Sequence, residues 1–263
     1  MAVQGELFDL TGKTALITGS SKGIGKAIAH RMAEHGANVV ISSRKTDACE
    51  SARAEINKLV GREAAISVPA NIADKAALQN LVDETNRKFG KIDILVCNAA
   101  TNPYFGPMAG ISDEQFEKIL KNNIISNHWL IHMVAPQMRA RKDGVVIVIS
   151  SIGGLRGGGG IGAYNISKAA DMQLARNLAS EFARDNVRVN TIAPGLVKTD
   201  FARALWDRPA PPPAPDAPPP SLRRTMGEPD DIAGMAVLLS GKAGLFANGQ
   251  TFVLDGGATA IGS

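Results

Sequence analysis

Residues 14–25 read TALITGSSKGIG, and this stretch decides the fold class. The first five residues form a short apolar run typical of a buried strand, and the glycines of the following turn come directly after it. Such glycines allow a tight turn and let the backbone approach a pyrophosphate, which would meet the free N–H groups of the next helix. The spacing is Gly-x3-Gly-x-Gly rather than GxGxxG, so the prediction of a phosphate-binding turn rests on its strand–turn–helix context.

Six further apolar runs follow, separated by segments with helical patterns. Several are apolar throughout, as expected of parallel strands that are covered on both faces. The whole chain, residues 1–263, is therefore predicted to form a single α/β domain of the Rossmann type. It would contain a doubly wound parallel sheet of about seven strands with helices on both faces. The six runs are NVVIS, AAISV, IDILVC, GVVIVIS, VRVNTI and TFVLD, and helices are expected to begin near Gly25, Thr46, Asp74, Ser112, Gly162 and Pro229.

Composition narrows the classes of function. Hydrophobic residues make up 44% and charged residues 21%, the balance of a soluble globular protein. No apolar stretch approaches the roughly 18 residues of a membrane helix, and the first residues do not resemble a secretory signal. Cys49 and Cys97, the only cysteines, favour a reducing cytoplasm. The basic residues are dispersed and the net charge is only +4, so we expect no nucleic-acid partner. We also expect no membrane partner and no bound metal.

The segment from Pro209 to Pro220 departs from the α/β pattern, because it holds eight prolines in twelve residues. A helix cannot run through such a segment, so polyproline II or disorder is expected. We interpret residues 205–222, approximately, as a surface excursion from the α/β core.

The segment AYNISKAA, residues 163–170, places a phenol and an amine on one face of a helix. Tyr164 and Lys168 are four residues apart, so the ammonium would favour the phenolate. Tyr164 could then give a proton to a carbonyl oxygen as a hydride arrives, or take one from an alcohol. Ser151, thirteen residues before Tyr164, could hydrogen-bond the same oxygen, with Ser150 as its alternative. Behind a phosphate-binding turn, these residues indicate hydride transfer to or from a carbonyl.

The end of the second apolar run bears on the choice of cofactor. An enzyme that uses NAD would place a carboxylate there for the ribose 2′-hydroxyl. The next acidic residue is Asp47, which a helix start explains. Arg44, together with Lys22 in the glycine turn, instead offers two cations that suit a 2′-phosphate. The sequence therefore predicts NADP(H) rather than NAD(H).

Five motifs carry a resemblance to a known family: TGSSKGIG, CNAA at Cys97–Ala100, Ser151, YNISK and APGLVKT. Over nearly its whole length the chain resembles the short-chain dehydrogenase/reductase superfamily, and within it the NADPH-dependent carbonyl/retinal reductases. The resemblance implies a homotetramer and a small carbonyl or alcohol substrate. A peroxisomal tripeptide, often present in that subgroup, is replaced here by IGS, so the expected location stays cytoplasmic.

The resemblance also implies a catalytic set of Asn123, Ser151, Tyr164 and Lys168. Asn123 would hold a helix distortion and a water that links Lys168 to solvent, with Asn122 and Asn127 as its neighbouring alternatives. Asn71 stands where the family commonly has an aspartate that meets adenine. The implied cofactor-binding residues are Gly19, Ser21, Lys22, Gly23, Ile24, Gly25, Ser43, Arg44, Asn71, Ile72, Asn98, Ala99, Ala100, Tyr164, Lys168, Pro194, Gly195, Val197 and Thr199.

Other functions on the same scaffold stay open from the sequence. A 3-oxoacyl-thioester reductase or a sugar or steroid dehydrogenase would need the same motifs. A non-catalytic NADP(H) sensor could dispense with Tyr164 or Lys168, and both are present. The proline-rich run occupies the place of the family's substrate lid, which predicts a broad pocket with weak discrimination. Candidate pocket residues are Asn102, Tyr104, Ile152, Gly153, Ile161, Phe201 and Trp206.

Overall fold

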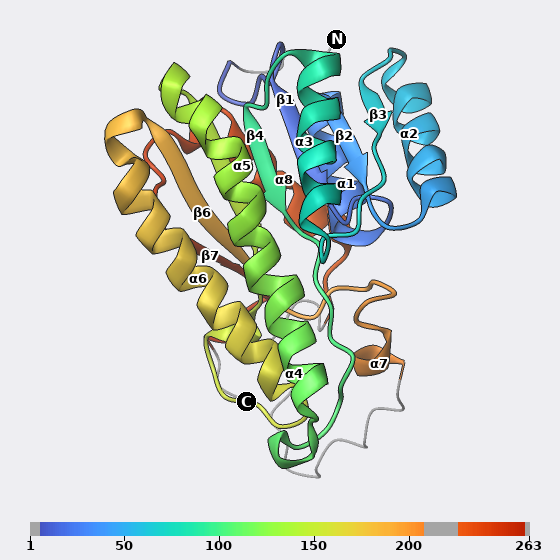
Figure 1. Cartoon of the computed structure of the whole chain (residues 1–263), viewed down its shortest axis with the longest axis vertical. Coiled ribbons are helices and arrows are strands. Elements are labelled where there is room, and N and C mark those ends of the chain that lie inside the picture. Colours follow the sequence, from blue (N-terminus) through green and yellow to red (C-terminus); the bar gives the residue numbers. More distant parts are fainter. Residues whose placement is uncertain (1–5, 208–225, 261–263) are drawn as a thin grey trace.

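A seven-stranded parallel sheet forms the centre of the protein, with the strand order β3-β2-β1-β4-β5-β6-β7 (Figure 1). The computed structural model describes residues 6–207 and 226–260. The chain builds outward from β1 to β3, returns to place β4 beside β1, and then builds outward to β7. The predicted doubly wound Rossmann-type fold is confirmed. The strands are β1 (Thr14–Thr18), β2 (Asn38–Ser42), β3 (Ala65–Ser67), β4 (Ile94–Cys97), β5 (Gly144–Ile149), β6 (Val187–Pro194) and β7 (Thr251–Leu254).

The central strands are buried on both faces, which explains their apolar sequences. Every residue of β1, β4, β5 and β6 is buried. Successive side chains of a strand point to opposite faces, so neighbours such as Leu16 and Ile17 enter different cores. β7 lies at the edge of the sheet and is only partly covered.

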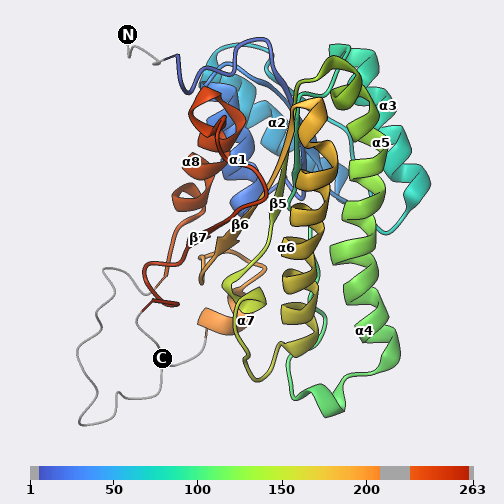
Figure 2. The same ribbon diagram turned by 90° about the vertical axis from the view of Figure 1, so that its left-hand side faces the viewer.

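Helices form one layer on each side of the sheet (Figure 2). The core that contains Ile17 is closed by α1 (Gly23–Glu34), α2 (Thr46–Val60) and α8 (Pro229–Ser240). The core that contains Leu16 is closed by α3 (Lys75–Phe89), α5 (Ser126–Arg141) and α6 (Gly162–Phe182). The remaining helices are α4 (Asp113–Leu120) and α7 (Arg203–Trp206), with 3-10 turns η1 (Met108–Gly110), η3 (Ile152–Gly154), η4 (Ala183–Asp185) and η5 (Lys242–Gly244).

Local sequence signals set several helix ends. Ser112 begins α4 with a capping box, in which its side chain and that of Gln115 satisfy each other's backbone N–H groups. Asp74 caps α3 by accepting hydrogen bonds from two backbone N–H groups of the first turn. Gly36 follows the end of α1 with a φ of +99°, a conformation that favours glycine. The helix starts predicted at Thr46, Asp74, Ser112, Gly162 and Pro229 agree with the structure within one residue.

The helical segment that begins after Ser112 is interrupted by a π-helical turn, η2 (Lys121–Ile125), between α4 and α5. Asn123 lies buried in this turn. Its Oδ1 accepts from Thr101 N at 2.8 Å, and its Nδ2 donates to Thr101 O at 3.1 Å. The Asn123 amide thus makes a pair of hydrogen bonds with the backbone of the segment that follows β4. These bonds hold the distorted helix at the carboxyl end of that strand. The proline-rich run lies outside the described residues.

Candidate active site

A cavity of about 1500 Å³ runs along the carboxyl ends of the strands. The segments that follow β1 to β6 all contribute to its wall, because parallel strands end at the same edge of the sheet. The crevice where the strand order reverses, between β1 and β4, lies within it. The predicted cofactor-binding residues that line it are Gly19, Ser21, Lys22, Gly23, Ile24, Ser43, Arg44, Asn71, Ile72, Asn98, Ala99, Ala100, Tyr164, Lys168, Pro194, Gly195, Val197 and Thr199.

The glycine turn after β1 needs glycine for two different reasons. Gly19 and Gly23 have φ values of +66° and +58°, which side chains rarely adopt. Gly25, the predicted residue that does not line the cavity, is restricted by space instead. A Cβ on Gly25 would lie 2.5 Å from Asn98 Nδ2 and 2.5 Å from Gly19 O. Gly25 therefore lets the start of α1 pack directly against the turn and β4.

Asn98 holds the glycine turn against the sheet. Its Nδ2 donates to Thr18 O at 2.9 Å and to Gly19 O at 3.1 Å. Thr18 Oγ1 in return accepts from the backbone N–H groups of Asn98 and Ala99, each at 3.1 Å. The ends of β1 and β4 are locked together by these bonds, and the crevice between them keeps a fixed width.

Replacement of Gly25 by alanine is expected to weaken cofactor binding and to destabilise the fold by about 1–3 kcal/mol, because the new methyl group meets backbone that cannot move aside. The matched control is Gly234→Ala in α8. Gly234 is exposed, and a Cβ there meets nothing within 4 Å. This control should raise stability by about 0.5–1 kcal/mol. Thermal unfolding and cofactor titration of both variants would test the pair. Equal melting temperatures would contradict the packing argument.

The end of the cavity beside β2 carries exposed basic groups. Arg44 is exposed at the cavity wall, next to Ser43. Lys22 Nζ lies 3.0 Å from Asp200 Oδ2, and both residues line the cavity. The acidic residues that line the described cavity are Asp200 and Glu228, and neither follows β2. Arg44 thus lies beside β2 with no acidic residue after that strand on the described cavity wall, whereas Lys22 is paired with the carboxylate of Asp200.

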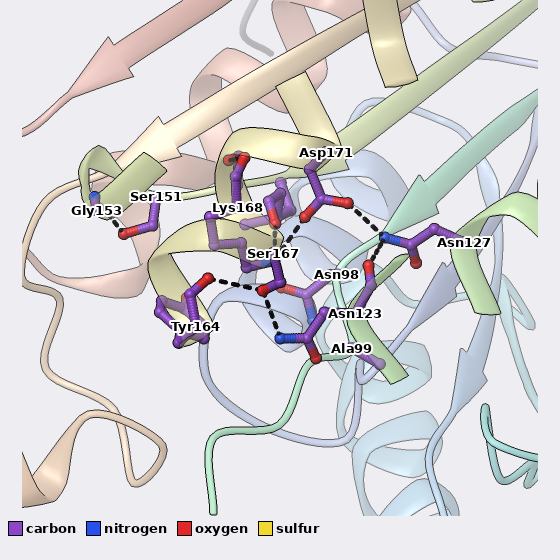
Figure 3. Close-up of polar contacts among 12 residues, drawn as sticks. Asn98, Ala99, Asn123, Asn127, Ser151, Gly153, Tyr164, Ser167, Lys168 and Asp171 are labelled. Atoms are coloured by element: carbon purple, nitrogen blue, oxygen red, sulfur yellow. Dashed lines mark hydrogen bonds and ion pairs between the residues drawn. The ribbon is translucent and has the colours of Figure 1, made fainter. Parts of the chain in front are cut away.

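Ser151, Tyr164 and Lys168 follow β5, which lies on the other side of the β1–β4 crevice from β2, and they line the same cavity. Their side chains are drawn in Figure 3. Lys168 Nζ lies 5.7 Å from the centroid of the Tyr164 ring. Burial raises the pKa of Tyr164, while the Lys168 ammonium and a hydrogen bond with the Ser151 side chain oppose that rise. Ser151 Oγ also accepts from Gly153 N at 3.1 Å, which orients the hydroxyl. A phenol, a hydroxyl and an ammonium thus belong to residues that line one cavity. Ser150, the alternative, donates to Lys168 O at 2.7 Å and is buried.

Lys168 is buried with 2% of its surface exposed, and its ammonium has two fixed partners. Nζ donates to Ile149 O at 2.8 Å and to Asp171 Oδ2 at 3.0 Å. Burial works against the charged form, but Asp171 and Tyr164 outweigh it and raise the pKa of Lys168. Sequence reasoning missed Asp171. Its one signal was its spacing, three residues after Lys168 on the same helix.

The three neighbouring asparagines have different surroundings. Asn123 Nδ2 donates to Ser167 Oγ at 3.0 Å, and Ser167 Oγ donates to Tyr164 O at 2.7 Å (Figure 3). Asn123 itself does not line the cavity, whereas Asn122 does. Asn127 Nδ2 donates to Asn123 O at 2.6 Å and to Asp171 Oδ1 at 3.0 Å. The π-helical turn and the segment of α6 that carries Tyr164 are therefore joined by one hydrogen-bonded network.

The substrate end of the cavity differs in part from the sequence-based expectation. Tyr104 and Trp206 do not line it. The Tyr104 hydroxyl donates to Pro107 O, and Trp206 Nε1 donates to Thr199 O at 3.1 Å. Trp206 is instead hydrogen-bonded to the backbone of the segment that follows β6. The other candidates, Asn102, Ile152, Gly153, Ile161 and Phe201, line the cavity, together with residues that were not anticipated, namely Arg156, Ala202, Leu205 and Thr259.

Across residues 6–207 and 226–260, no cluster of three or more His, Cys, Asp or Glu side chains could hold a metal ion. No helix in the same ranges is both long and apolar enough to span a membrane.

Comparison with known proteins assigns the family. Residues 19–259 match the family model described as enoyl-(acyl carrier protein) reductase. The chain is 38% identical over 251 residues to dehydrogenase/reductase SDR family member 4 of Homo sapiens, covering 94% of this chain and 88% of the human protein. The mouse protein of the same name is 36% identical over 250 residues, with 94% and 88% covered. The chain belongs to the short-chain dehydrogenase/reductase family of nicotinamide-dependent oxidoreductases.

Solved structures agree with this assignment. A short-chain dehydrogenase/reductase from Mycobacterium marinum is 32% identical and has a TM-score of 0.86, covering 97% of this chain and 98% of its own. A 7α-hydroxysteroid dehydrogenase in complex with NADH and a 7-oxo bile acid is 33% identical, with a TM-score of 0.85 and 96% of each chain covered. A putative gluconate 5-dehydrogenase from Beutenbergia cavernae with bound NADP is 31% identical, with a TM-score of 0.85, and 97% and 100% are covered. One of these structures holds NADH and another holds NADP, so the similarity leaves the cofactor of this chain open.

Proposed function

We propose that this chain is an NADP(H)-dependent oxidoreductase that interconverts a carbonyl compound and its secondary alcohol. The observation that carries the proposal is the distribution of residues along one cavity. The phenol of Tyr164, the hydroxyl of Ser151 and the ammonium of Lys168 gather at one end, and Arg44 lies at the other. The glycine turn lies between them, at the crevice where the sheet order reverses.

The shape and chemistry of the cavity fit a dinucleotide. The absence of side chains at Gly19 and Gly23 leaves backbone N–H groups at the start of α1 open to a pyrophosphate. Lys168 Nζ donates two of its three N–H groups to Ile149 O and Asp171 Oδ2. The third N–H group is left for a ribose hydroxyl or for Tyr164. When bound, the nicotinamide would supply or accept the hydride. Pro194, Gly195, Val197 and Thr199, all on the cavity wall, would hold its ring end.

The protein's own residues account for the proton and for the orientation of the substrate. Ser151 donates a hydrogen bond to the substrate oxygen, so that the carbonyl carbon faces the cofactor. The Tyr164 hydroxyl gives its proton to that oxygen in reduction and recovers it in oxidation. The Lys168 ammonium stabilises the phenolate that remains, which offsets the effect of burial on the Tyr164 pKa. Asn123 holds the π-helical turn and, through Ser167, the backbone of Tyr164.

The apolar side chains that line the cavity near Tyr164 support the proposal of an apolar carbonyl substrate. Ile152, Ile161, Phe201 and Leu205 line the cavity, beside the glycines of residues 157–159. The Phe201 ring lies 5.9 Å from that of Tyr164, so an apolar group would pack beside the reacting oxygen. The test is NADPH consumption, with NADH in parallel, against ketones, aldehydes, diketones, retinal and an acetoacetyl thioester. Turnover that requires NADH, or none with any of these carbonyls while NADPH binds, would contradict the proposal.

A steroid dehydrogenase is the second candidate function. It is favoured by the structural similarity to the 7α-hydroxysteroid dehydrogenase with its bound oxo bile acid, and by the same apolar side chains of the cavity. Adding an oxosteroid to the substrate panel separates the two candidates, since they share the proton chemistry and differ only in the preferred substrate.

The ion pair between Lys22 and Asp200 leads to a prediction about cofactor affinity. Asp200 holds the Lys22 ammonium that we propose for the 2′-phosphate, and the hydrogen bond from Lys22 lowers the pKa of Asp200. In Asp200→Asn the ammonium is released from its carboxylate partner. NADPH should bind about two- to fivefold more tightly, with little change for NADH, and the gain should shrink at high salt. Fluorescence titration of both cofactors would measure it. An equal gain for NADH would point away from the 2′-phosphate.

The assembly and the location are also part of the proposal. Leu245 and Phe246 precede β7 and are strongly exposed, and Val253 on this edge strand is exposed as well. Such apolar side chains at a sheet edge support the homotetramer that the resemblance implies. Two reduced, buried cysteines, Cys49 and Cys97, support a cytoplasmic location.

A further inference from the structure

Asp171 is a buried carboxylate beside the proposed catalytic lysine, and the general proton chemistry above does not require it. None of its surface is exposed. Both of its oxygens accept hydrogen bonds: Oδ2 from Lys168 Nζ at 3.0 Å, and Oδ1 from Asn127 Nδ2 at 3.0 Å (Figure 3). A protonated carboxyl group would need an acceptor for its own hydrogen, whereas here both oxygens face donors. Burial raises the pKa of Asp171, while the Lys168 ammonium and the hydrogen bonds from Lys168 and Asn127 act against that rise. The contacts themselves fit the ionised form, because each oxygen meets a donor.

Asn127 holds this carboxylate in place from the neighbouring helix. Its amide nitrogen has two hydrogens, and both are used, one by Asp171 Oδ1 and one by Asn123 O at 2.6 Å. Asn127 thus connects the ion pair on α6 to the π-helical turn that carries Asn123. The amide cannot rotate without breaking both bonds, so the carboxylate has one fixed position opposite the lysine.

The ionisable groups that act on Lys168 are few. Besides Asp171 they are Tyr164 on the same helix and Cys97 at the end of β4. Burial raises the pKa of the Cys97 thiol far above neutrality, so Cys97 carries no charge at working pH. Facing groups from η2, α5 and β5 are the amides of Asn123 and Asn127 and the carbonyl of Ile149, all neutral. Lys168, Tyr164 and Asp171 therefore form one isolated cluster of charges.

We propose that Asp171, held by Asn127, is a positioning residue that serves as the permanent counter-ion of Lys168. It fixes the ammonium against the carbonyl of Ile149 and sets the pH at which the Tyr164–Lys168 pair gives up its first proton. This inference rests on the proposed function of Tyr164 and Lys168. The negative charge of Asp171 also opposes formation of the Tyr164 phenolate, so it raises the pKa of Tyr164 as well as that of Lys168.

The sign of the expected effect does not depend on which member loses the proton. Without the negative charge of Asp171, both the Lys168 ammonium and the Tyr164 phenol lose a proton more readily. Coupled groups release protons in steps that belong to the pair. The first step of the pair should therefore move to lower pH in Asp171→Asn, by about one pH unit or more.

The two tyrosines of the chain make a direct test possible. In a Tyr104→Phe background Tyr164 is the single tyrosine, and a ¹³C label on its ring reports both its own ionisation and that of the nearby ammonium. Titrations of this protein with and without Asp171→Asn would be compared, with the exposed Asp143→Asn as the matched control. We expect the first deprotonation of the Tyr164–Lys168 pair to occur at lower pH in Asp171→Asn and at an unchanged pH in Asp143→Asn. If the first deprotonation of Asp171→Asn occurs at the parent's pH or at a higher one, the proposal is overturned.

If Asp171→Asn folds poorly, the pH dependence of its melting temperature provides a second test. An unpaired buried lysine prefers its neutral form, so the unfolded chain would bind more protons than the folded one, and stability would rise with pH. The melting temperature of Asp171→Asn should therefore recover toward that of the parent as the pH rises from neutrality. Asp171→Glu, which keeps the charge, should retain the parent's titration step. No recovery, with equal damage in Asp171→Glu, would mean that Asp171 only fills space. Both readouts need no substrate, so they stay informative if the proposed reaction fails.

Discussion

Tyr164→Phe is expected to lower the rate of hydride transfer by about 10³-fold while leaving cofactor affinity nearly unchanged. The substitution removes the hydroxyl that gives its proton to the substrate oxygen, and it keeps the ring that packs against Phe201. The loss should therefore fall on kcat rather than on KM, because the missing interaction belongs to the transition state. Single-turnover measurements with saturating NADPH would record it.

Tyr104→Phe is the matched control for this experiment. Tyr104 is the other tyrosine of the chain, does not line the cavity, and donates its hydroxyl proton to Pro107 O. Activity of this variant should stay within about twofold of the parent, in line with the small effects of most substitutions outside a site. Comparable losses in both variants would indicate a general loss of structure and would remove the support for Tyr164 as the proton donor.

Arg44→Asp is expected to change the ratio of NADPH to NADH affinity by about 100-fold, in favour of NADH. The substitution removes a guanidinium that can pair with a 2′-phosphate, and a charge-assisted hydrogen bond of this kind contributes about 1.5–3 kcal/mol. It also places a carboxylate at the end of β2, where the ribose 2′-hydroxyl of NAD would be recognised. Direct titration of both cofactors gives the ratio without a substrate.

The neighbouring residue provides the control for charge alone. Lys45 is exposed like Arg44, yet it does not line the cavity. Lys45→Asp reverses the same charge, so a long-range electrostatic effect would appear in both variants. We expect the affinity ratio of Lys45→Asp to change less than about threefold, because exposed charges are screened over roughly 10 Å. An unchanged ratio in Arg44→Asp would contradict the proposed role of Arg44.

The sheet could be predicted from the sequence because the chain alternates between two simple patterns. Runs such as TALIT are apolar throughout, since both faces of a central strand are covered. The doubly wound class follows from the same reasoning, because parallel strands need crossover helices and the glycine turn marks the first of them. The order of the strands is seen in the structure alone. The two edge strands, β3 and β7, are partly exposed, and both still lie at the expected places in the chain.

The distortion between α4 and α5 could not be derived from periodicity. It depends on Asn123, whose amide bonds reach Thr101 and Ser167, residues that are distant in the sequence. Family resemblance suggested a distortion there, whereas the residues alone indicate only a helix that begins near Ser112. Asp171 was missed for a similar reason. A carboxylate three residues after a lysine is usually a solvated helix pair, whereas this one is buried and also accepts a hydrogen bond from Asn127 of α5.

The residues that line the cavity and those that build the core lie largely in separate parts of the chain, although Ile149 and Val197 belong to both sets. The strands supply buried aliphatic side chains, and the segments that follow β1 to β6 supply the cavity wall. In evolutionary terms, this arrangement lets the two parts drift independently. A loop can acquire a new preference among substrates without an effect on the sheet, while a strand can exchange one aliphatic residue for another without an effect on the reaction. Lineages that share this scaffold can therefore diverge in metabolism much faster than in architecture.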